Sequence, residues 1–328
     1  MPEAWKEWEG KRAGDQFLLR RYLGGGDRSG VFLTDWSKPP RKAAIKLVVA
    51  EPDRAKTQLE LWERTAELSH PRLIQFLGAG MCRLRGTDLI YLVTEYADER
   101  LSEVVPERRL SADETAELLQ KVLEGLAFLH SKGWVHAELK PSNILSVDEQ
   151  LKISRGGLRR MGETREDTWK PGSYDPPGVP GRRISAAGDV WSLGLTLVEA
   201  LTQRLPSFDG GTRETALPEV LPPPFHQIAM QCLQPDAEDR WTIAEITAQL
   251  QHGLTVGAGA STAGAPAVSP RWWKRLMIWQ GECPDCGSHD LTRSRRRSFW
   301  EKTFSGVLLP YRCGRCGARF YRLRVAGG

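Results

Sequence analysis

Short apolar runs alternate with turn residues over the first hundred positions. Three such runs lie between Phe17 and Leu47, separated by glycine-rich or polar stretches, and another covers residues 89–94. This pattern predicts antiparallel strands. Residues 53–69 instead place apolar side chains at helical spacing, which predicts one helix beside the sheet.

The pattern changes to longer helices further along the chain. Ser111 and Glu114 stand three residues apart just before an apolar repeat over 118–129, a spacing typical of a capping box at a helix start. Residues 189–201 are apolar on nearly every side, as in a helix buried inside a large lobe. Two later apolar clusters predict further helices, at 228–233 and 243–250.

Composition divides the chain further. Residues 253–270 carry no charge and consist mainly of small residues, which is typical of a flexible linker. The predicted segments are an N-terminal extension at 1–16, a main domain at 17–252, the linker at 253–270, a basic and aromatic segment at 271–280, and a small module at 281–324.

The net charge of +5 is unevenly distributed, because residues 271–328 alone carry +9. The basic character therefore belongs to the C-terminal end. The sequence has no apolar run of signal-peptide type and none near the ~20 residues of a membrane-spanning helix, so we expect a cytoplasmic protein. Cys82 and Cys232 stand alone in apolar contexts, and we expect buried thiols rather than a disulfide.

Three motifs carry the candidate chemistry of the main domain. Residues 24–31 read Gly-Gly-Gly-Asp-Arg-Ser-Gly-Val, residues 43–46 read Ala-Ala-Ile-Lys, and residues 136–145 read His-Ala-Glu-Leu-Lys-Pro-Ser-Asn-Ile-Leu. Backbone amides of a glycine-rich turn can cover phosphates. Taken alone, the first motif is equally typical of an ordinary hairpin turn, and the second of a strand lysine that faces solvent.

Together the motifs resemble those of the protein kinase superfamily, of the bacterial Ser/Thr type. The third resembles the catalytic loop His-Arg-Asp-Leu-Lys-Pro-x-Asn, and residues 189–194 and 239–242 resemble later elements of the family. The resemblance covers about residues 17–250 in the correct order. It implies an α+β, two-lobed protein-kinase-like fold, with a small β-rich N-lobe, a larger α-helical C-lobe and a nucleotide cleft between them.

The resemblance also implies which residues line an ATP cleft. Lys140 and Asn143 occupy retained catalytic-loop positions. The family pairs the strand lysine with a glutamate on the next helix; Glu60 is the candidate, although an ungapped count back from His70 puts Leu61 in that place. The positions implied to contact nucleotide are Gly24, Gly26, Val31, Ala44, Lys46, Glu60, Glu95, Ala97 and Leu145.

Two positions depart from the family's pattern. Glu138 replaces the aspartate that orients the substrate hydroxyl, and a misplacement of about 1 Å can cost on the order of 100-fold in rate. Arg155 replaces the aspartate that binds magnesium, and a cation cannot ligate a metal ion. The retained residues favour nucleotide binding over phosphoryl transfer, and Arg155 puts the use of magnesium in doubt.

Two arrangements of Arg155 stay open from the sequence. Its guanidinium could contact phosphate and take over part of the charge-neutralising role of magnesium. Alternatively, it could pair with Glu138 or Glu60 and fill an empty cleft.

The C-terminal module contains two C-x-x-C pairs, each followed by glycine and separated by 26 residues. Four thiolates at this spacing suit a tetrahedral structural zinc ion, and the module resembles a zinc ribbon with short strands around residues 311–320. Paired disulfides or a redox dithiol are the alternatives. The predicted zinc ligands are Cys283, Cys286, Cys313 and Cys316.

Basic and aromatic residues mix over residues 271–302. Such a composition suits nucleic acid, an acidic protein or an anionic membrane surface, although a solvated basic loop or packing against a neighbouring domain would produce the same pattern. The segment therefore predicts a partner without identifying its class.

These observations favour a pseudokinase that binds ATP weakly or without metal and acts as a scaffold or regulator, with the zinc ribbon recruiting a protein partner. Two other functions stay open. One is an atypical active Ser/Thr kinase that transfers the γ-phosphate of ATP to protein hydroxyls. The other is a nucleic-acid-binding zinc protein with the kinase fold as a spacer.

Overall fold

The structure is a computed structural model and divides into two units, Met1–Thr255 and Val256–Gly328. Each unit is described by itself. No described helix is long and apolar enough to cross a membrane. The described residues are 2–14, 16–37, 39–164, 172–177, 183–208, 215–259, 291–293, 308–313 and 319–323.

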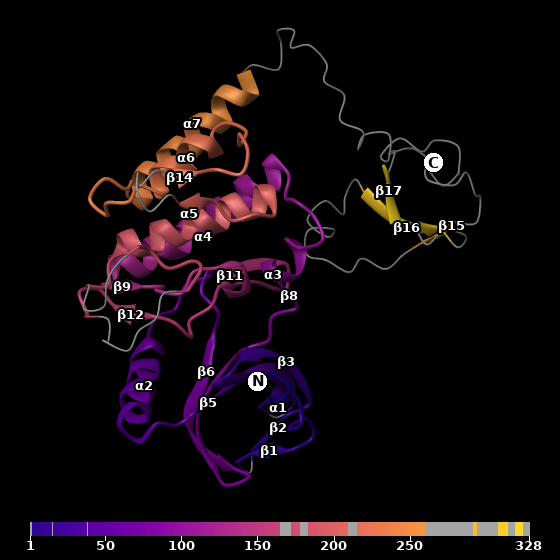
Figure 1. Cartoon of the computed structure of the whole chain (residues 1–328). Coiled ribbons are helices and arrows are strands. Elements are labelled where there is room, and N and C mark those ends of the chain that lie inside the picture. Colours follow the sequence, from indigo (N-terminus) through magenta and orange to yellow (C-terminus); the bar gives the residue numbers. More distant parts are fainter. Residues whose placement is uncertain are drawn as a thin grey trace. The chain divides into compact units, whose positions relative to one another are not determined.

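A five-stranded antiparallel sheet builds the N-lobe of the first unit (Figure 1). Its order is β3-β4-β5-β7-β6, and helix α2 (Pro52–Thr65) connects β5 to β6 and packs on β6 and β7. The predicted strands and helix of the first hundred residues are thereby confirmed. The strands are β3 (Arg21–Gly26), β4 (Ser29–Trp36), β5 (Arg41–Val49), β6 (Phe76–Leu84) and β7 (Thr87–Glu95).

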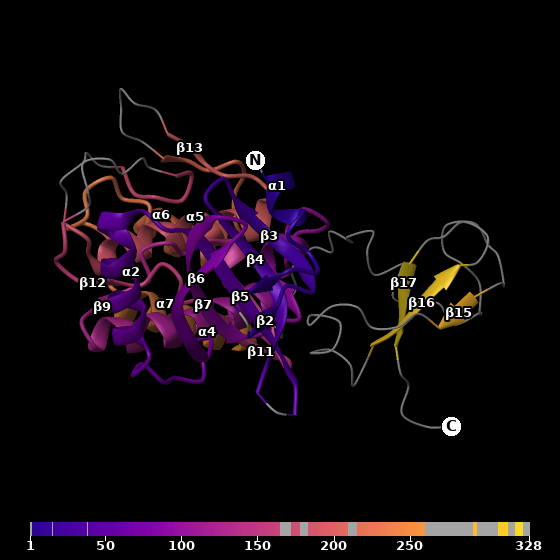
Figure 2. The same ribbon diagram turned by 90° about the horizontal axis from the view of Figure 1, so that it is seen from below.

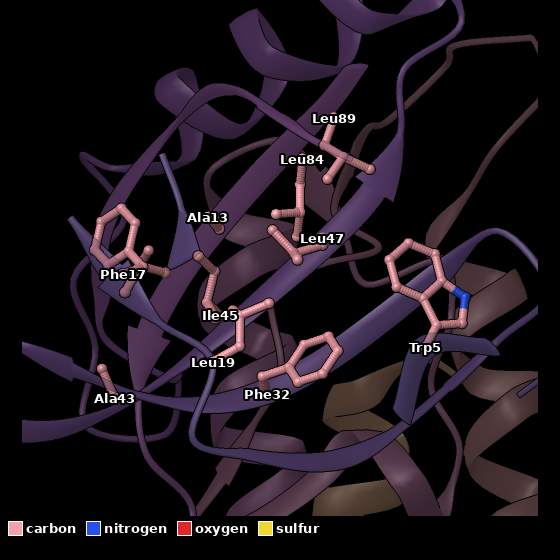
Figure 3. Close-up of a cluster of buried hydrophobic side chains, with 11 residues drawn as sticks. Trp5, Ala13, Phe17, Leu19, Phe32, Ala43, Ile45, Leu47, Leu84 and Leu89 are labelled. Atoms are coloured by element: carbon pink, nitrogen blue, oxygen red, sulfur yellow. The ribbon is translucent and has the colours of Figure 1, made fainter. Parts of the chain in front are cut away.

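One face of this sheet is sealed by residues that precede it in the chain. Helix α1 (Pro2–Lys6) and the hairpin of β1 (Arg12–Ala13) with β2 (Phe17–Leu18) lie there, and Figure 3 shows Trp5 and Ala13 within one apolar cluster with alternate residues of β5. A Cβ at Gly30 would lie 2.7 Å from the Trp5 indole. The segment predicted as an N-terminal extension therefore completes the N-lobe core.

The C-lobe is mainly helical, and the view in Figure 2 looks past the N-lobe sheet onto its helices. Several short strands and one 3-10 helix (η1) lie on the side that faces the N-lobe, whereas β14 lies beside α6 (Figure 1). The helices are α3 (Leu101–Val104), α4 (Ala112–Ser131), η1 (Pro141–Asn143), α5 (Ala186–Thr202), α6 (Phe225–Cys232) and α7 (Ile243–Gly259). The strands are β8 (Glu99–Arg100), β9 (Trp134–Val135), β10 (Ile144–Val147), β11 (Gln150–Ile153), β12 (Arg159–Arg160), β13 (Ser207–Phe208) and β14 (Thr215–Ala216).

The starts and burial of these helices follow from local sequence. The Ser111 hydroxyl accepts a hydrogen bond from the Glu114 amide at 3.2 Å, and the Glu114 carboxylate accepts one from the Ser111 amide at 2.8 Å, so the predicted capping box is confirmed. Helix α5 is buried along almost its whole length, as its apolar composition predicts. Cys232 is fully buried and burial raises its pKa to about 12, whereas Cys82 is only partly buried.

Helix α7 runs further than the composition predicts. It ends at Gly259, so residues 253–259 of the predicted linker are helical, and residues 260–270 lie outside the described part of the chain. Gly253 faces Pro224 so closely that a Cβ would lie 2.6 Å from the proline ring. Residues 253–259, which were predicted to belong to the linker, therefore continue helix α7. Gly253 permits close packing against Pro224.

The second unit contains a three-stranded antiparallel sheet, ordered β15-β16-β17. Its strands are β15 (Leu291–Arg293), β16 (Leu308–Cys313) and β17 (Arg319–Leu323), with Tyr311 opposite Phe320. Strands are therefore present where the zinc-ribbon resemblance implies them. The zinc prediction itself stays a prediction, because Cys283, Cys286 and Cys316 and the side chain of Cys313 lie outside the described residues, as does the segment 271–280.

Candidate functional site

A cleft of about 740 Å³ lies between the two lobes of the first unit. The structure brings to it every residue predicted for the nucleotide and catalytic positions except Glu60. These residues are Gly24, Gly26, Val31, Ala44, Lys46, Glu95, Ala97, Glu138, Lys140, Asn143, Leu145 and Arg155.

The glycine-rich hairpin of β3 and β4 covers one side of the cleft. The strand register shifts between Tyr22 and Gly24, where Gly24 has φ of +129°, a conformation that favours glycine. A Cβ at Gly25 would lie 2.2 Å from the carbonyl oxygen of Ser29. These glycines let the two strands approach closely above the cleft.

Strand β5 supplies two residues to the same side of the cleft. Ala44 lies opposite Thr94 of β7, and Lys46 lies opposite Leu92. Because alternate residues of a strand share a face, the small side chain and the lysine both reach the cleft.

The catalytic loop is held from below by Asp189, which is 1% exposed. Its carboxylate accepts hydrogen bonds from the backbone amides of His136 and Ala137, each at 2.8 Å, and lies 2.8 Å from Nε2 of His130. Ala137 has φ of +60°. A buried charge of this kind requires full hydrogen bonding, so the loop's unusual backbone and its anchor depend on each other.

Glu138 extends from this loop into the cleft, where its side chain is exposed. Asn143 Nδ2 donates to the Glu138 carbonyl oxygen at 2.7 Å, which fixes the backbone beneath it. Desolvation raises the pKa of Glu138, but the nearby positive charges, first Lys46 and then Lys140 and Arg159, together outweigh that effect and hold the pKa below its usual value. Glu138 is therefore ionised at neutral pH.

Arg155 turns away from the space where a nucleotide phosphate would lie, and its side chain is 2% exposed. Nε donates to the Ile74 carbonyl at 2.8 Å, Nη2 to the Leu68 carbonyl at 2.8 Å, and Nη1 to the Thr65 carbonyl. Burial lowers the pKa of Arg155 to about 10, which still leaves it charged at neutral pH.

The predicted pairing of Arg155 with Glu138 or Glu60 is therefore wrong, and its predicted contact with phosphate stays a prediction. The guanidinium donates to the carbonyl of Thr65 at the end of α2, to that of Leu68 just beyond it, and to that of Ile74 before β6. A cation at this end also suits the helix dipole. Arg155 thus ties the start of the segment after β11 to the N-lobe helix.

The prediction for Glu60 is also wrong. Its carboxylate lies on the outer face of α2, 3.9 Å from Lys56, and is half exposed. Trp62 is buried on the inner face and donates to the Gly156 carbonyl at 3.4 Å, and Gln58 accepts from Arg159 at 3.3 Å. The helical spacing of the buried residues Ala55, Trp62 and Thr65 identifies this inner face. Glu60 does not share that spacing, and its charge alone made it a candidate.

Arg100 is a cleft residue that sequence reasoning missed. Standing at the junction of β8 and α3, it donates from Nη2 to the Leu23 carbonyl of the glycine-rich hairpin at 2.8 Å and to Glu103 at 2.7 Å. Nearby, Glu95 accepts from Lys152 of β11 at 2.5 Å. Both contacts join lobes across the outer end of the cleft. The available signal was a basic residue a few positions after Glu95 and Ala97, which were predicted to contact nucleotide.

The inner end of the cleft does not fit the magnesium ion that kinase domains use with ATP. Position 155 offers a guanidinium already bound to backbone carbonyls, and the described residues contain no group of three or more His, Cys, Asp or Glu side chains able to hold a metal. The apolar residues Val31, Ala44 and Leu145 and the size of the cleft do fit a nucleoside.

A β-rich lobe, a helical lobe and a cleft with a glycine-rich hairpin above and an aspartate-anchored loop below define the protein kinase fold. A family model for the protein kinase domain matches residues 17–252. The chain therefore belongs to the protein kinase domain family.

Curated relatives that are each 26% identical to this chain include three named kinases. Tyrosine-protein kinase Abl of Drosophila melanogaster matches 75% of this chain and 16% of its own length. For serine/threonine-protein kinase PksC of Streptomyces coelicolor, the match covers 79% of this chain and 52% of the relative. For serine/threonine-protein kinase pakE of Dictyostelium discoideum, it covers 73% of this chain and 28% of the relative. The chain thus spans about half of these relatives' length or less.

Proposed function

We propose that this kinase domain is a pseudokinase, which acts in the cytoplasm as a scaffold or regulator of a protein partner and transfers phosphate slowly or not at all. The observation that carries the proposal is the environment of Arg155. At the position where magnesium would need a carboxylate, the chain has a buried cation with its Nε, Nη1 and Nη2 groups hydrogen-bonded to backbone carbonyls.

The contacts of Arg155 also support a role that depends on shape. An active kinase uses a lysine–glutamate pair to position the helix that corresponds to α2. Here the hydrogen bonds from Arg155 to the Thr65 carbonyl and from Trp62 to the Gly156 carbonyl connect α2 to the C-lobe. Such a domain presents one arrangement of its lobes to a partner.

The adenine side of the cleft favours a nucleotide as its ligand. Val31, Ala44 and Leu145 offer an apolar slot, and Lys46 and Lys140 stand at its inner end. ATP is therefore expected to bind weakly and without magnesium.

The C-terminal unit would recruit the partner. Its three-stranded sheet and the order of its cysteines support a zinc ribbon with Cys283, Cys286, Cys313 and Cys316 as ligands. Four protein ligands would leave the zinc no open position, so its role would be structural. The basic residues among 271–302 suit an acidic surface on that partner.

The alternative function is an active Ser/Thr kinase, and it is favoured by the retention of Lys46, Lys140 and Asn143 in one cleft with an ionised Glu138. A radiolabelled-ATP assay separates the two functions. Purified protein is incubated with basic and acidic protein substrates, in magnesium and in manganese, beside the Lys46→Ala variant. The proposal predicts no transfer above that of Lys46→Ala, and transfer that requires Lys46 would overturn it.

A further inference from the structure

The inner end of the cleft has an unusual charge balance. Lys46 and Lys140 face the carboxylate of Glu138 there. Arg155 is buried, and its Nε, Nη1 and Nη2 groups each donate to a backbone carbonyl rather than into this space. Among the described residues that line this end, Lys46, Lys140 and Glu138 are the charged groups that would meet an entering ligand.

Two consecutive glycines bring the opposing charges together. A Cβ at Gly156 would lie 3.3 Å from Nζ of Lys46, and a Cβ at Gly157 would lie 2.8 Å from both Cβ and Cγ of Glu138. The lysine and the glutamate thus lie against neighbouring residues of the same backbone segment. A phosphate that reaches Lys46 must also come close to Glu138.

We propose, building on the pseudokinase function, that this cleft binds a nucleoside diphosphate without metal and in preference to the triphosphate, with Glu138 as the residue that discriminates between them. The apolar slot recognises the nucleoside in either case. Lys46 and Lys140 attract the first phosphates, whereas each added phosphate brings about one more negative charge toward Glu138. Because the described residues contain no group of carboxylates that could hold magnesium, no bound metal ion would offset that repulsion.

The test is a calorimetric titration of the full chain with ADP and with ATP, in EDTA and then in magnesium. The wild type should bind ADP about tenfold more tightly than ATP in EDTA, an order of magnitude set by like charges near a protein surface. Magnesium should leave the affinity for ADP unchanged within about twofold.

The variant Glu138→Gln removes the charge and keeps the size of the side chain. It should bind ATP and ADP within about twofold of each other. Glu107→Gln is the matched control, because Glu107 is exposed and does not line the cleft; it should keep the wild-type preference. The comparison of ADP with ATP on the wild type stands even if Glu138→Gln does not fold.

Three results would overturn the inference: ATP binding as tightly as ADP, a preference for ADP that survives in Glu138→Gln, or no binding of either nucleotide. The last result leaves the pseudokinase function intact, since a scaffold needs no ligand. Conversely, phosphotransfer that requires Lys46 would overturn the pseudokinase function whichever nucleotide binds more tightly.

Discussion

The catalytic loop and the segment that follows β11 are each held in place by a buried charge, and the two charges have opposite sign. Asp189 holds the loop by accepting from two backbone amides, and Arg155 holds the later segment by donating to three backbone carbonyls. Both satisfy polar backbone that would otherwise be buried without partners. The first supports a loop that still faces the cleft, whereas the second uses a position at which the family binds metal.

We infer from this difference that a kinase fold and kinase chemistry depend on separate sets of contacts. The anchor at Asp189 needs no ligand, so the loop keeps its shape after its catalytic residue has changed. The metal position requires a carboxylate directed into the cleft, and a cation directed out of it can stabilise the fold while removing that chemistry.

The largest effect is expected for Asp189→Asn. The change places an amide NH2 opposite buried N–H donors and removes the negative charge that faces His130. The free energy of unfolding should therefore fall by about 3 kcal/mol or more. Urea denaturation measures the loss, with Glu107→Gln as an exposed control. A loss no larger than that of the control would mean that the loop does not depend on this anchor.

Arg155→Met should lower the free energy of unfolding by about 2–3 kcal/mol, because the three hydrogen bonds from the guanidinium to backbone carbonyls are lost while the apolar stem of the side chain is kept. Arg155→Lys should recover only part of this loss, since a single ammonium cannot reproduce the planar fork of a guanidinium. The same urea experiment applies. If Arg155→Met is as stable as the wild type, Arg155 does not tie α2 to the C-lobe.

Gly157→Ala should lower the free energy of unfolding by about 1–2 kcal/mol, because the new Cβ would lie 2.8 Å from the Glu138 side chain. The double variant Gly157→Ala with Glu138→Gly should recover most of that loss, because glycine also removes the Cβ of residue 138, which lies 2.8 Å from the new Cβ. Gly26→Ala is the control, because nothing lies within 4 Å of a Cβ there. A loss that persists in the double variant would place the clash elsewhere.

Arg100→Ala tests the outer end of the cleft. The side chain is partly exposed and its pair with Glu103 is a surface pair, so the change should cost less than about 1 kcal/mol. Hydrogen exchange at the amides of 24–26 should still accelerate, because the Leu23 carbonyl loses its donor. Exchange after Ile153 should stay the same; acceleration at both places would show that one arginine controls the whole cleft.

The smallest effect concerns pH. The pKa of Glu138 is lowered from 4.5 in the folded chain, so its contribution to stability is present above that pH and is lost as the pH falls through the lower folded value. The stability difference between wild type and Glu138→Gln should therefore be larger at about pH 6 than at about pH 3.5. Thermal unfolding across this range measures it, and a difference that grows in acid would contradict the assigned sign.

Much of the cleft could be predicted from the sequence, because strand alternation and motif spacing decide which positions face it. Ala44 and Lys46 reach the cleft for this reason, as do Val31 and Leu145. The capping box at Ser111 is equally local, since both partners lie within one turn.

The directions of long side chains could not be predicted in this way. Arg155 was assigned to the cleft by its position, but its orientation depends on carbonyls 81 to 90 residues away in the chain. Glu60 was chosen for its charge, although the helical face decides what meets the cleft. Packing of Trp5 against Gly30 likewise depends on a contact distant in sequence.

The orientation of Arg155 can be measured directly from its side-chain Nε–H signal in a nitrogen-15 NMR spectrum, assigned by its loss in Arg155→Lys. We predict slow hydrogen exchange in the free protein and no shift when ATP or ADP is added, since Nε donates to the buried Ile74 carbonyl. Fast exchange in the free protein, with a shift and protection on adding nucleotide, would show that Arg155 serves the ligand and would contradict the account.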